Sequence, residues 1–453
     1  MMGAVRWVSG RSRAVLAVGL AGWSVLAGGV APARAADALN WYYDQTGVAE
    51  VVADGFDGRG LTIAVLDGPI DTGLAVFADA DIEVRSVCGY PPGLEGLDPN
   101  GPGPGDSTRD QLIADAPSDS LNALSHGTTV TALLVGNGAS VNGTPGPKGV
   151  APKAKIIHYV TGSGLHDSVA SCLRDGNDLG GVGILETLPT LNTSGADIVT
   201  TSMGGELEDK AVDFEVSGML GFQALRNSQE GIDGVMSPDF HPGLVYVRGS
   251  QPDGELPERL HFEEPLTTVV APGGTDSAGL TLTPDGWVVE EMGGNSAATP
   301  ILAGIMADLW VKYPDATSNQ LLQSLVRNTI EFDHEPHYTT TWGWGPVDVP
   351  HLFSVDPTQY PDANPLTSTL GVINETPTTA APSPKPTSED SSPPSEPATA
   401  EPSPTQTVAA QPEDRRDQSS RFWVSLAAAV VVAGGFVAAA LIVTKRKRFG
   451  KQV

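Results

Sequence analysis

The sequence predicts an α/β domain with a central parallel sheet, and two observations support this fold class. Between about residue 40 and residue 355, short apolar runs rich in β-branched residues alternate with segments that have apolar residues at helical spacing. Residues 62–66 are apolar on both alternating faces, as expected for a strand of a parallel sheet that is covered on both sides. Ligands of such sheets bind beyond the carboxyl ends of the strands, so functional side chains are expected there.

Each predicted element has a local reason. Strands are expected where a short apolar or β-branched run is bounded by turn-forming residues, and helices where apolar residues recur at helical spacing. The predicted strands are residues 61–66, 154–160, 197–202, 244–247 and 267–270. The predicted helices are residues 127–135, 212–226, 297–311 and 318–329.

The first 35 residues have the features of a secretory signal peptide. Arginines come first, an apolar run covers residues 14–30, and the small-x-small cleavage pattern Ala33-Arg34-Ala35 follows. We therefore expect cleavage after residue 35 and a short N-terminal arm, residues 36–55, packed on the domain. An uncleaved N-terminal anchor is the alternative.

The C-terminal end predicts a membrane anchor. Residues 422–444 form an apolar run long enough to span a bilayer, and a basic tail, residues 445–453, follows directly. The positive-inside rule places this tail in the cytoplasm, so the domain of a single-pass protein is expected outside the cell membrane. A buried core helix is the alternative. Residues 356–421, rich in Pro, Ser and Thr, are expected to be an extended linker, with a ligand motif as the alternative.

Composition limits the partners and cofactors. A net charge of −28 argues against nucleic acid as a partner. The chain has two cysteines, Cys88 and Cys172, which form either one disulfide in an exported domain or two free thiols. The histidines show no metal-ligand spacing, so neither a metal nor another cofactor is expected.

Three separated residues fit one chemistry. Asp67 ends a buried strand, His126 stands before an apolar helix, and Ser296 lies in a small-residue turn before another helix. A serine nucleophile needs a base, histidine is suited to take and return the proton, and an aspartate fixes the imidazole tautomer. Asp, His and Ser also occur here in one of the known chain orders of such triads. Taken singly, each residue could instead be a turn residue or a helix cap.

The flanking motifs resemble those of the subtilisin-like serine proteases, the subtilases. Besides Asp67 and Ser296, the matching motifs are His126-Gly127-Thr128, Gly149-Val150-Ala151-Pro152, Asp197 to Gly205, Ala271-Pro272-Gly273 and Trp342 to Asp348. The resemblance implies a subtilisin-like three-layer peptidase domain over residues 56–355, with Asp67, His126 and Ser296 as the catalytic triad. It also implies that the substrate cleft is lined by Ser202, Met203 and Gly204.

The order of segments resembles that of the mycosins, the membrane-anchored subtilases of actinobacterial type VII secretion systems. Both have a signal peptide, a subtilase domain, a Pro-rich linker, one C-terminal helix and a basic tail. This resemblance implies a protein or peptide substrate and membrane proteins of a secretion system as partners.

Three departures from the subtilase motifs bear on activity. Gly68-Pro69 follows the aspartate, where the family usually has Thr-Gly or Ser-Gly, and Thr129 stands where a second histidine is common. The asparagine that usually ends a strand and binds the oxyanion is best matched by Ser250. We therefore expect Ser250 or Asn295, with the backbone N–H of the nucleophile, to bind the oxyanion; loss of one such donor costs about 10²–10³ in turnover.

Two functions are expected from these observations. The first is a membrane-anchored extracellular serine endopeptidase that uses the triad. The second is a catalytically weakened scaffold or binding subunit of a membrane secretion complex, suggested by Gly68, Pro69 and Ser250. The acidic, Gly/Pro-rich run 93–122 is expected to be an extended loop beside the site that gates substrates or docks a partner, or an inert insertion.

Overall fold

The computed structural model describes residues 38–368, apart from 92, 102, 163–172, 175–176, 179–186, 188–189, 204–216, 229–240, 242, 330–331 and 334–337. The predicted signal peptide, membrane segment and basic tail lie outside the described residues. None of the helices within the described ranges has the length and hydropathy needed to cross a membrane.

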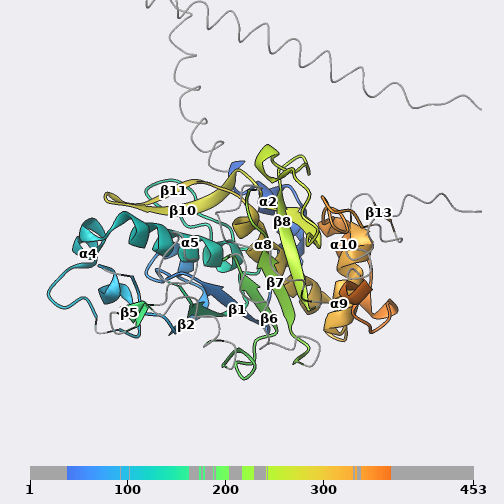
Figure 1. Ribbon diagram of the computed structural model, residues 1–453, viewed down its shortest axis with the longest axis horizontal. Helices are drawn as coiled ribbons and strands as arrows, with labels where there is room; N and C mark the ends of the chain where they lie inside the picture. Colours follow the sequence, from blue (N-terminus) through green and yellow to red (C-terminus); the bar gives the residue numbers. More distant parts are fainter. Residues whose placement is uncertain are drawn as a thin grey trace, which may run out of the picture. The chain divides into compact units, whose positions relative to one another are not determined.

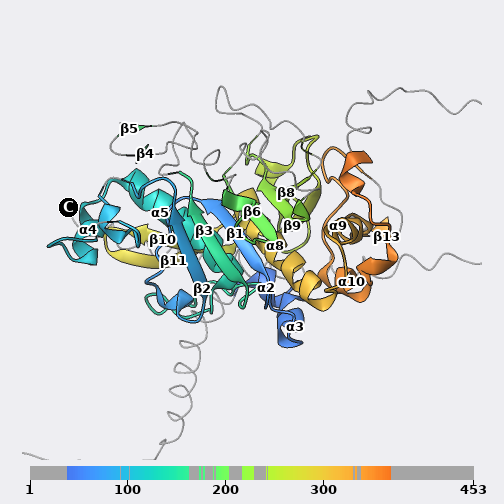
Figure 2. The same ribbon diagram turned by 90° about the horizontal axis from the view of Figure 1, so that it is seen from below.

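The domain is built on a seven-stranded parallel sheet with the strand order β2-β3-β1-β6-β7-β8-β9. Its strands are β1 Thr62–Asp67, β2 Asp81–Ser86, β3 Lys155–Val160, β6 Ile198–Thr201, β7 Leu220–Ala224, β8 Leu244–Ser250 and β9 Val269–Pro272. Figure 2 shows the strands of the sheet side by side, from β2 to β9. Because all strands are parallel, their carboxyl ends lie at one edge, and the predicted fold class is confirmed.

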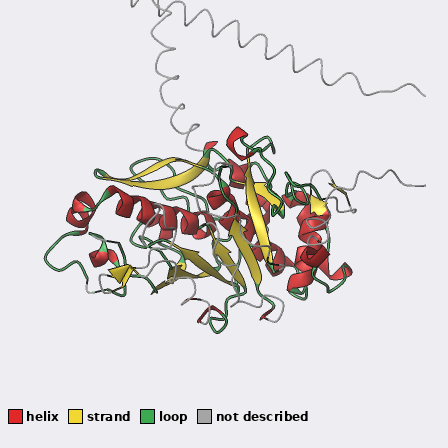
Figure 3. Ribbon diagram, viewed as in Figure 1, coloured by secondary structure: helices red, strands yellow, loops and turns green. Residues whose placement is uncertain are grey.

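Two long helices, α5 Ser118–Val135 and α8 Asn295–Lys312, pack against one another over the sheet. Helix α8 contacts β6, β7, β8 and β9, and α5 contacts β1, so both share one apolar core with that face of the sheet. A hairpin, β10 Ser277–Thr283 and β11 Gly286–Met292, lies along α5 on the side away from the sheet (Figures 1 and 3). A second apolar cluster, which includes Leu66, Tyr159 and Tyr246, covers the opposite face of the sheet.

The remaining elements are short. The helices are α2 Trp41–Asp44, α3 Val48–Ala53, α4 Arg109–Asp115, α9 Ser318–Arg327 and α10 Val349–Ser354. The strands are β4 Leu173–Arg174, β5 Asn177–Asp178, β12 Asn328–Thr329 and β13 Phe332–Asp333. Single 3-10 turns occupy Ala75–Phe77, Glu95–Leu97, Glu258–Leu260, Pro357–Gln359 and Pro365–Ser368.

The predicted helix over residues 212–226 is wrong, because Leu220–Ala224 is β7, an interior strand of the sheet. All five residues of β7 are buried, and hydrogen bonds to β6 and β8 satisfy its backbone on both sides. Gly221 also weakens a helix at this point. Residues 204–216 lie outside the described residues.

Three predicted boundaries also change. Helix α5 begins at Ser118, well before the predicted start, because Leu121 and Leu124 in its polar-looking first half are buried. The end of the predicted loop 93–122 is therefore helical. The same stretch also contains helix α4, which begins with a capping box formed by Thr108 and Gln111. The linker begins later than residue 356, because the fold continues through the buried Leu366.

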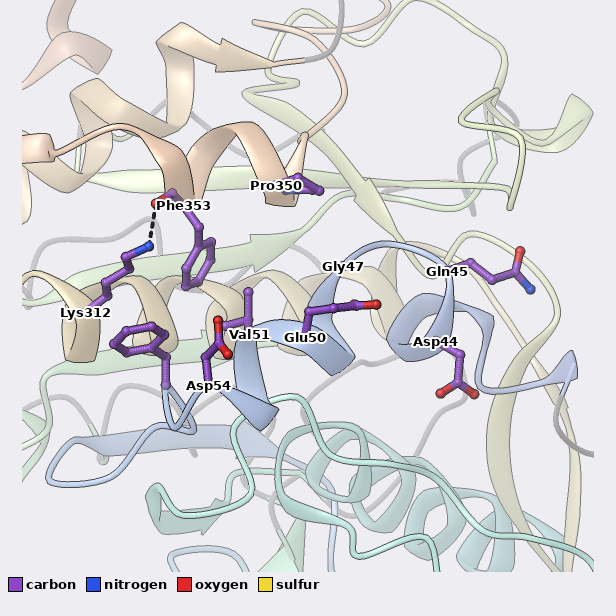
Figure 4. Close-up of a pocket in the computed structure, with 10 residues that line it drawn as sticks. Asp44, Gln45, Gly47, Glu50, Val51, Asp54, Lys312, Pro350 and Phe353 are labelled. Atoms are coloured by element: carbon purple, nitrogen blue, oxygen red, sulfur yellow. Dashed lines mark hydrogen bonds between the residues drawn. The ribbon is translucent and has the colours of Figure 1, made fainter.

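The N-terminal arm is part of the folded domain. Trp41 and Tyr42 are buried; the Trp41 indole donates to the Thr275 carbonyl at 3.0 Å, and the Tyr42 hydroxyl donates to the Lys148 carbonyl at 2.9 Å. A pocket of about 350 Å³ lies between this arm, the end of α8 and α10, and Lys312 Nζ donates there to the Phe353 carbonyl at 2.8 Å (Figure 4). None of the residues lining this pocket belongs to the predicted triad.

Candidate active site

Asp67 is the last residue of β1 and is fully buried at the carboxyl edge of the sheet. Its Oδ1 accepts hydrogen bonds from the Gly68 backbone N–H and from His126 Nδ1, both at 2.7 Å. Its Oδ2 is also buried and has no hydrogen-bond partner among the described residues. The carboxylate is therefore directed at the imidazole, and one of its oxygens is left without support.

His126 lies within α5, and the glycine after it allows the helix to approach the segment that follows Asp67. A Cβ at Gly127 would lie 2.4 Å from the Pro69 carbonyl oxygen and 2.5 Å from that of Gly68, which no side chain tolerates. The His126 side chain is 15% exposed, so its ring is open to a substrate. Burial opposes its charging, but the Asp67 charge and hydrogen bond outweigh that effect, and the pKa of His126 is raised above its ordinary value of 6.5.

The hairpin β10–β11 fixes the position of α5 on either side of His126. The Ser125 hydroxyl accepts from the Leu282 backbone N–H at 2.8 Å. The Thr129 hydroxyl accepts from the Leu280 N–H at 2.8 Å and donates to the Leu280 carbonyl at 3.0 Å. Thr129, which replaces the second histidine common in the motif, thus joins the helix to the hairpin.

Ser296 is the second residue of α8 and is partly exposed. The turn before it requires glycine, since Gly294 has a φ of 123°. The Ser296 hydroxyl donates to the Ser202 carbonyl at 3.2 Å, and the Ser202 hydroxyl donates to the Ser296 carbonyl at 2.7 Å. Among the described residues it forms no hydrogen bond to His126.

The sheet register relates Ser296 to the Asp67–His126 pair. Leu66 of β1 pairs with Thr201 of β6, so Ser202 follows β6 directly beside Asp67. Neighbouring strands are about 4.8 Å apart, and Ser296 contacts Ser202. The structure therefore brings Ser296, through its contact with Ser202, to the same edge of the sheet as the Asp67–His126 pair, one strand away from Asp67.

The expected oxyanion role of Asn295 is wrong, because its side-chain amide already donates its hydrogen bonds to backbone carbonyls inside the fold. Its amide donates to the carbonyls of Leu225 at 2.9 Å and Arg226 at 2.8 Å, and its Oδ1 accepts from the Gly249 N–H at 2.9 Å. Asn295 is buried and ties the serine turn to the ends of β7 and β8.

The expected oxyanion role of Ser250 is wrong for a different reason. Ser250 ends β8, two strands from β6 in the sheet order and thus roughly 10 Å across the sheet. It is buried, and its hydroxyl donates to the Ala271 carbonyl at 3.4 Å.

Asn227, which follows β7, is a site residue that the sequence reasoning missed. It is exposed, and its Oδ1 accepts from the Asn295 backbone N–H at 2.8 Å. A Cβ added to Gly294 would lie 2.8 Å from Asn227 Oδ1 and 3.3 Å from Nδ2. The side-chain amide of Asn227 therefore lies against the serine turn, where its N–H groups can serve an anion forming at Ser296.

The other predicted site residues lie as follows. Met203 is buried directly after Ser202, and Gly204 lies outside the described residues. Cys88 is disulfide-bonded, and Cys172 lies outside the described residues.

The fold and the site together define a class of protein: an α/β domain that gathers an aspartate, a histidine and a serine at the carboxyl edge of a parallel sheet. Residues 58–345 match the model of the Subtilase family of peptidases, and the chain belongs to that family. A comparison with curated proteins gives no match.

The solved structures that are similar to this chain share little sequence with it. MycP1 from Mycobacterium smegmatis is 16% identical, with a TM-score of 0.46 over 71% of this chain and 86% of MycP1. The MycP3 protease from the type VII (ESX-3) secretion system is 16% identical, with a TM-score of 0.47 over 71% of this chain and 89% of MycP3. Fervidolysin from Fervidobacterium pennivorans, a keratinolytic enzyme related to subtilisin, is 19% identical, with a TM-score of 0.47 over 70% of this chain and 45% of its own.

Proposed function

We propose that this protein is a serine endopeptidase whose catalytic triad is Asp67, His126 and Ser296. The observation that carries the proposal is the 2.7 Å bond between His126 Nδ1 and the buried Asp67, with Ser296 of α8 bonded to Ser202, which follows the neighbouring strand β6. This bond leaves the other ring nitrogen, Nε2, to act as the base.

In the proposed reaction, Ser296 Oγ attacks the peptide carbonyl while His126 Nε2 takes its proton. The hydroxyl first leaves the Ser202 carbonyl by rotation about its Cα–Cβ bond, which is a small motion for a partly exposed side chain. His126 then gives the proton to the leaving amine, and Asp67 stabilises the imidazolium between the two transfers. Water hydrolyses the acyl-enzyme by the same steps in reverse order.

Asn227 Nδ2 and the backbone N–H of Ser296 are the proposed oxyanion donors. As the second residue of α8, Ser296 has an N–H without an intrahelical acceptor, at the end of the helix where partial positive charge collects. The bond from the Asn295 N–H to Asn227 Oδ1 fixes the amide orientation and leaves Nδ2 to donate to the oxyanion.

Replacing Asn227 by leucine is expected to lower kcat about 10²–10³-fold with little change in KM, because the lost bond is made mainly in the transition state. Steady-state cleavage of a peptide substrate measures both constants. Ser250→Ala is the matched control and is expected to keep the wild-type kcat. A larger loss in Ser250→Ala than in Asn227→Leu would restore the original assignment of Ser250.

The proposed setting is the outer face of a cell membrane, with a single C-terminal span and a cytoplasmic tail. The order of signal-like segment, peptidase domain, Pro-rich linker, apolar run and basic tail supports this topology. The same order supports a role as a mycosin of a type VII secretion system, with a secreted protein as substrate and secretion-system membrane proteins as partners.

A scaffold function is the second candidate, and two observations favour it. The Ser296 hydroxyl is bonded to Ser202 instead of His126, and the buried Asp67 Oδ2 has no partner in the part of the chain that the structure describes. A scaffold predicts that Ser296→Ala leaves secretion intact, whereas loss of the whole peptidase domain abolishes it.

A fluorophosphonate probe distinguishes the two candidates. With an endopeptidase, the probe is expected to label the full chain, peptide mapping should place the adduct on Ser296, and Ser296→Ala should remove it. Ser354→Ala, which changes an exposed serine on α10, is the control and should keep the label. Absence of labelling in the folded wild-type protein would favour the scaffold.

A further inference from the structure

A second histidine, His158, lies beneath the proposed triad and is fully buried in β3. Its Nε2 is 2.7 Å from the Gly68 carbonyl oxygen, and its Nδ1 is 2.9 Å from the Thr131 hydroxyl. A carbonyl oxygen only accepts, so Nε2 carries the proton of this bond. Burial lowers the pKa of His158, so the ring is neutral and Nδ1 accepts from Thr131.

The two bonds of His158 reach the two elements that carry the catalytic pair. Gly68 follows Asp67, and its own N–H donates to Asp67 Oδ1 at 2.7 Å. Thr131 belongs to α5, the helix of His126, and is fully buried. The imidazole of His158 therefore bridges the segment behind the carboxylate and the helix behind the base.

The environment of Gly68 explains why such a bridge is needed. The subtilase motif usually places threonine or serine here to support the aspartate, but a Cβ at Gly68 would lie 2.8 Å from the Ala123 carbonyl oxygen of α5. Helix α5 is too close for a side chain, and Asp67 Oδ2 has no partner among the described residues. Apart from His126, the Gly68 backbone is what orients the carboxylate within the described part of the chain, and His158 holds that backbone through its carbonyl.

We propose that His158 is a positioning residue of the triad. By joining the Gly68 carbonyl to Thr131, it holds the Asp67 carboxylate where it can hydrogen-bond to His126. This inference rests on the proposed endopeptidase function. It assigns to His158 a role in the geometry of the reaction, beyond that of a buried residue which only fills space.

Three substitutions test the bridge. His158→Leu removes both bonds and is expected to lower kcat roughly ten- to a hundred-fold, because small misplacements of catalytic groups have costs of this order, while KM changes less than about two-fold. His158→Gln can still donate to the Gly68 carbonyl and should recover most of kcat. Thr131→Val removes only the second bond, nearly isosterically, and should give an intermediate loss.

Ile156→Ala is the matched control, since Ile156 is buried on the same strand and face as His158. It should lower the melting temperature without changing kcat beyond about two-fold. Equal kcat losses in Ile156→Ala and His158→Leu, or failure of glutamine to rescue, would overturn the inference.

A readout independent of catalysis separates this inference from the proposed function. The pKa of His126 can be followed by NMR in the full chain with ring-labelled histidine, its signal assigned by its absence in His126→Ala. Weaker contact with Asp67 should move that pKa down toward 6.5 in His158→Leu but not in Ile156→Ala. If the wild-type protein is inactive but the His126 pKa still falls in His158→Leu, the bridge is kept and the protease function is rejected. If the wild-type protein is active but the His126 pKa does not move in His158→Leu, the bridge is rejected.

Discussion

Replacement of His126 by alanine is expected to lower kcat about 10⁶-fold, the size of loss that follows removal of the base from such a triad. Without the imidazole, Ser296 Oγ has no group to take its proton, and the amine leaves unprotonated. The proposed oxyanion donors and the substrate contacts remain, so a residual rate some 10³–10⁴-fold above that of the uncatalysed reaction should survive. Single-turnover cleavage of a peptide substrate measures this residual rate.

His351→Ala is the control for that loss, because His351 lies on α10, which packs toward the far end of α8 from Ser296. It should keep the wild-type kcat. A reduction of less than about ten-fold in a folded His126→Ala protein would rule out His126 as the base.

Replacement of Asp67 by asparagine is expected to lower kcat about 10⁴-fold and to move the acid limb of the pH profile. The amide carries no charge to stabilise the imidazolium. Its NH₂ would also occupy the buried position of Oδ2, which has no partner among the described residues. Both effects raise the free energy of the transition state while leaving substrate binding largely unchanged.

The direction of the pH shift follows from the causes of the His126 pKa. Protonated His126 cannot act as a base, so activity falls as the pH drops through its pKa. In the wild type this limb should lie above pH 6.5, because Asp67 outweighs burial and raises the pKa. In Asp67→Asn only burial remains, and the limb should move below pH 6.5 in a plot of kcat/KM against pH.

Asp57→Asn is the control for this shift, since Asp57 is a buried carboxylate paired with Arg59 instead of a histidine. It should leave the acid limb unmoved. Identical limbs in the wild type and Asp67→Asn would show that Asp67 does not set the pKa of His126.

The residues of the proposed triad could be picked out from the sequence because the glycines beside them have steric reasons and so form visible motifs. Gly127 is needed where α5 meets the segment after Asp67, and Gly294 is needed for the left-handed turn before Ser296. An apolar strand that ends in a carboxylate is likewise visible in the sequence alone.

The proposed oxyanion donor could not be predicted, because one strand was missing from the predicted sheet. Residues 212–226 have helical spacing, yet Leu220–Ala224 gains more as the interior strand β7, paired on both sides. Because β7 is not among the predicted strands, β8 is counted as the strand after β6, and Ser250 is then assigned the place after the strand that Asn227 occupies in the structure. The correction of one element therefore changes the proposed donor.

His158 could not be assigned from the sequence for a different reason. A histidine in an apolar strand has the same pattern whether it fills space or bridges two elements. Its role depends on Gly68 and Thr131, which are distant in the chain and meet its ring only in the folded protein.

The burial of the N-terminal arm limits where the signal peptide of the proposed exported protein can be cut. The Leu39 carbonyl accepts from the Ala278 N–H at 2.8 Å, and Leu39 is only four residues beyond the predicted cleavage site. Trp41 holds the Thr275 carbonyl, and Thr275 adjoins Gly293 of the serine turn. In the proposed exported enzyme, cleavage beyond Trp41 would therefore remove this contact beside the serine turn, so signal removal and the support of Ser296 depend on the same short stretch.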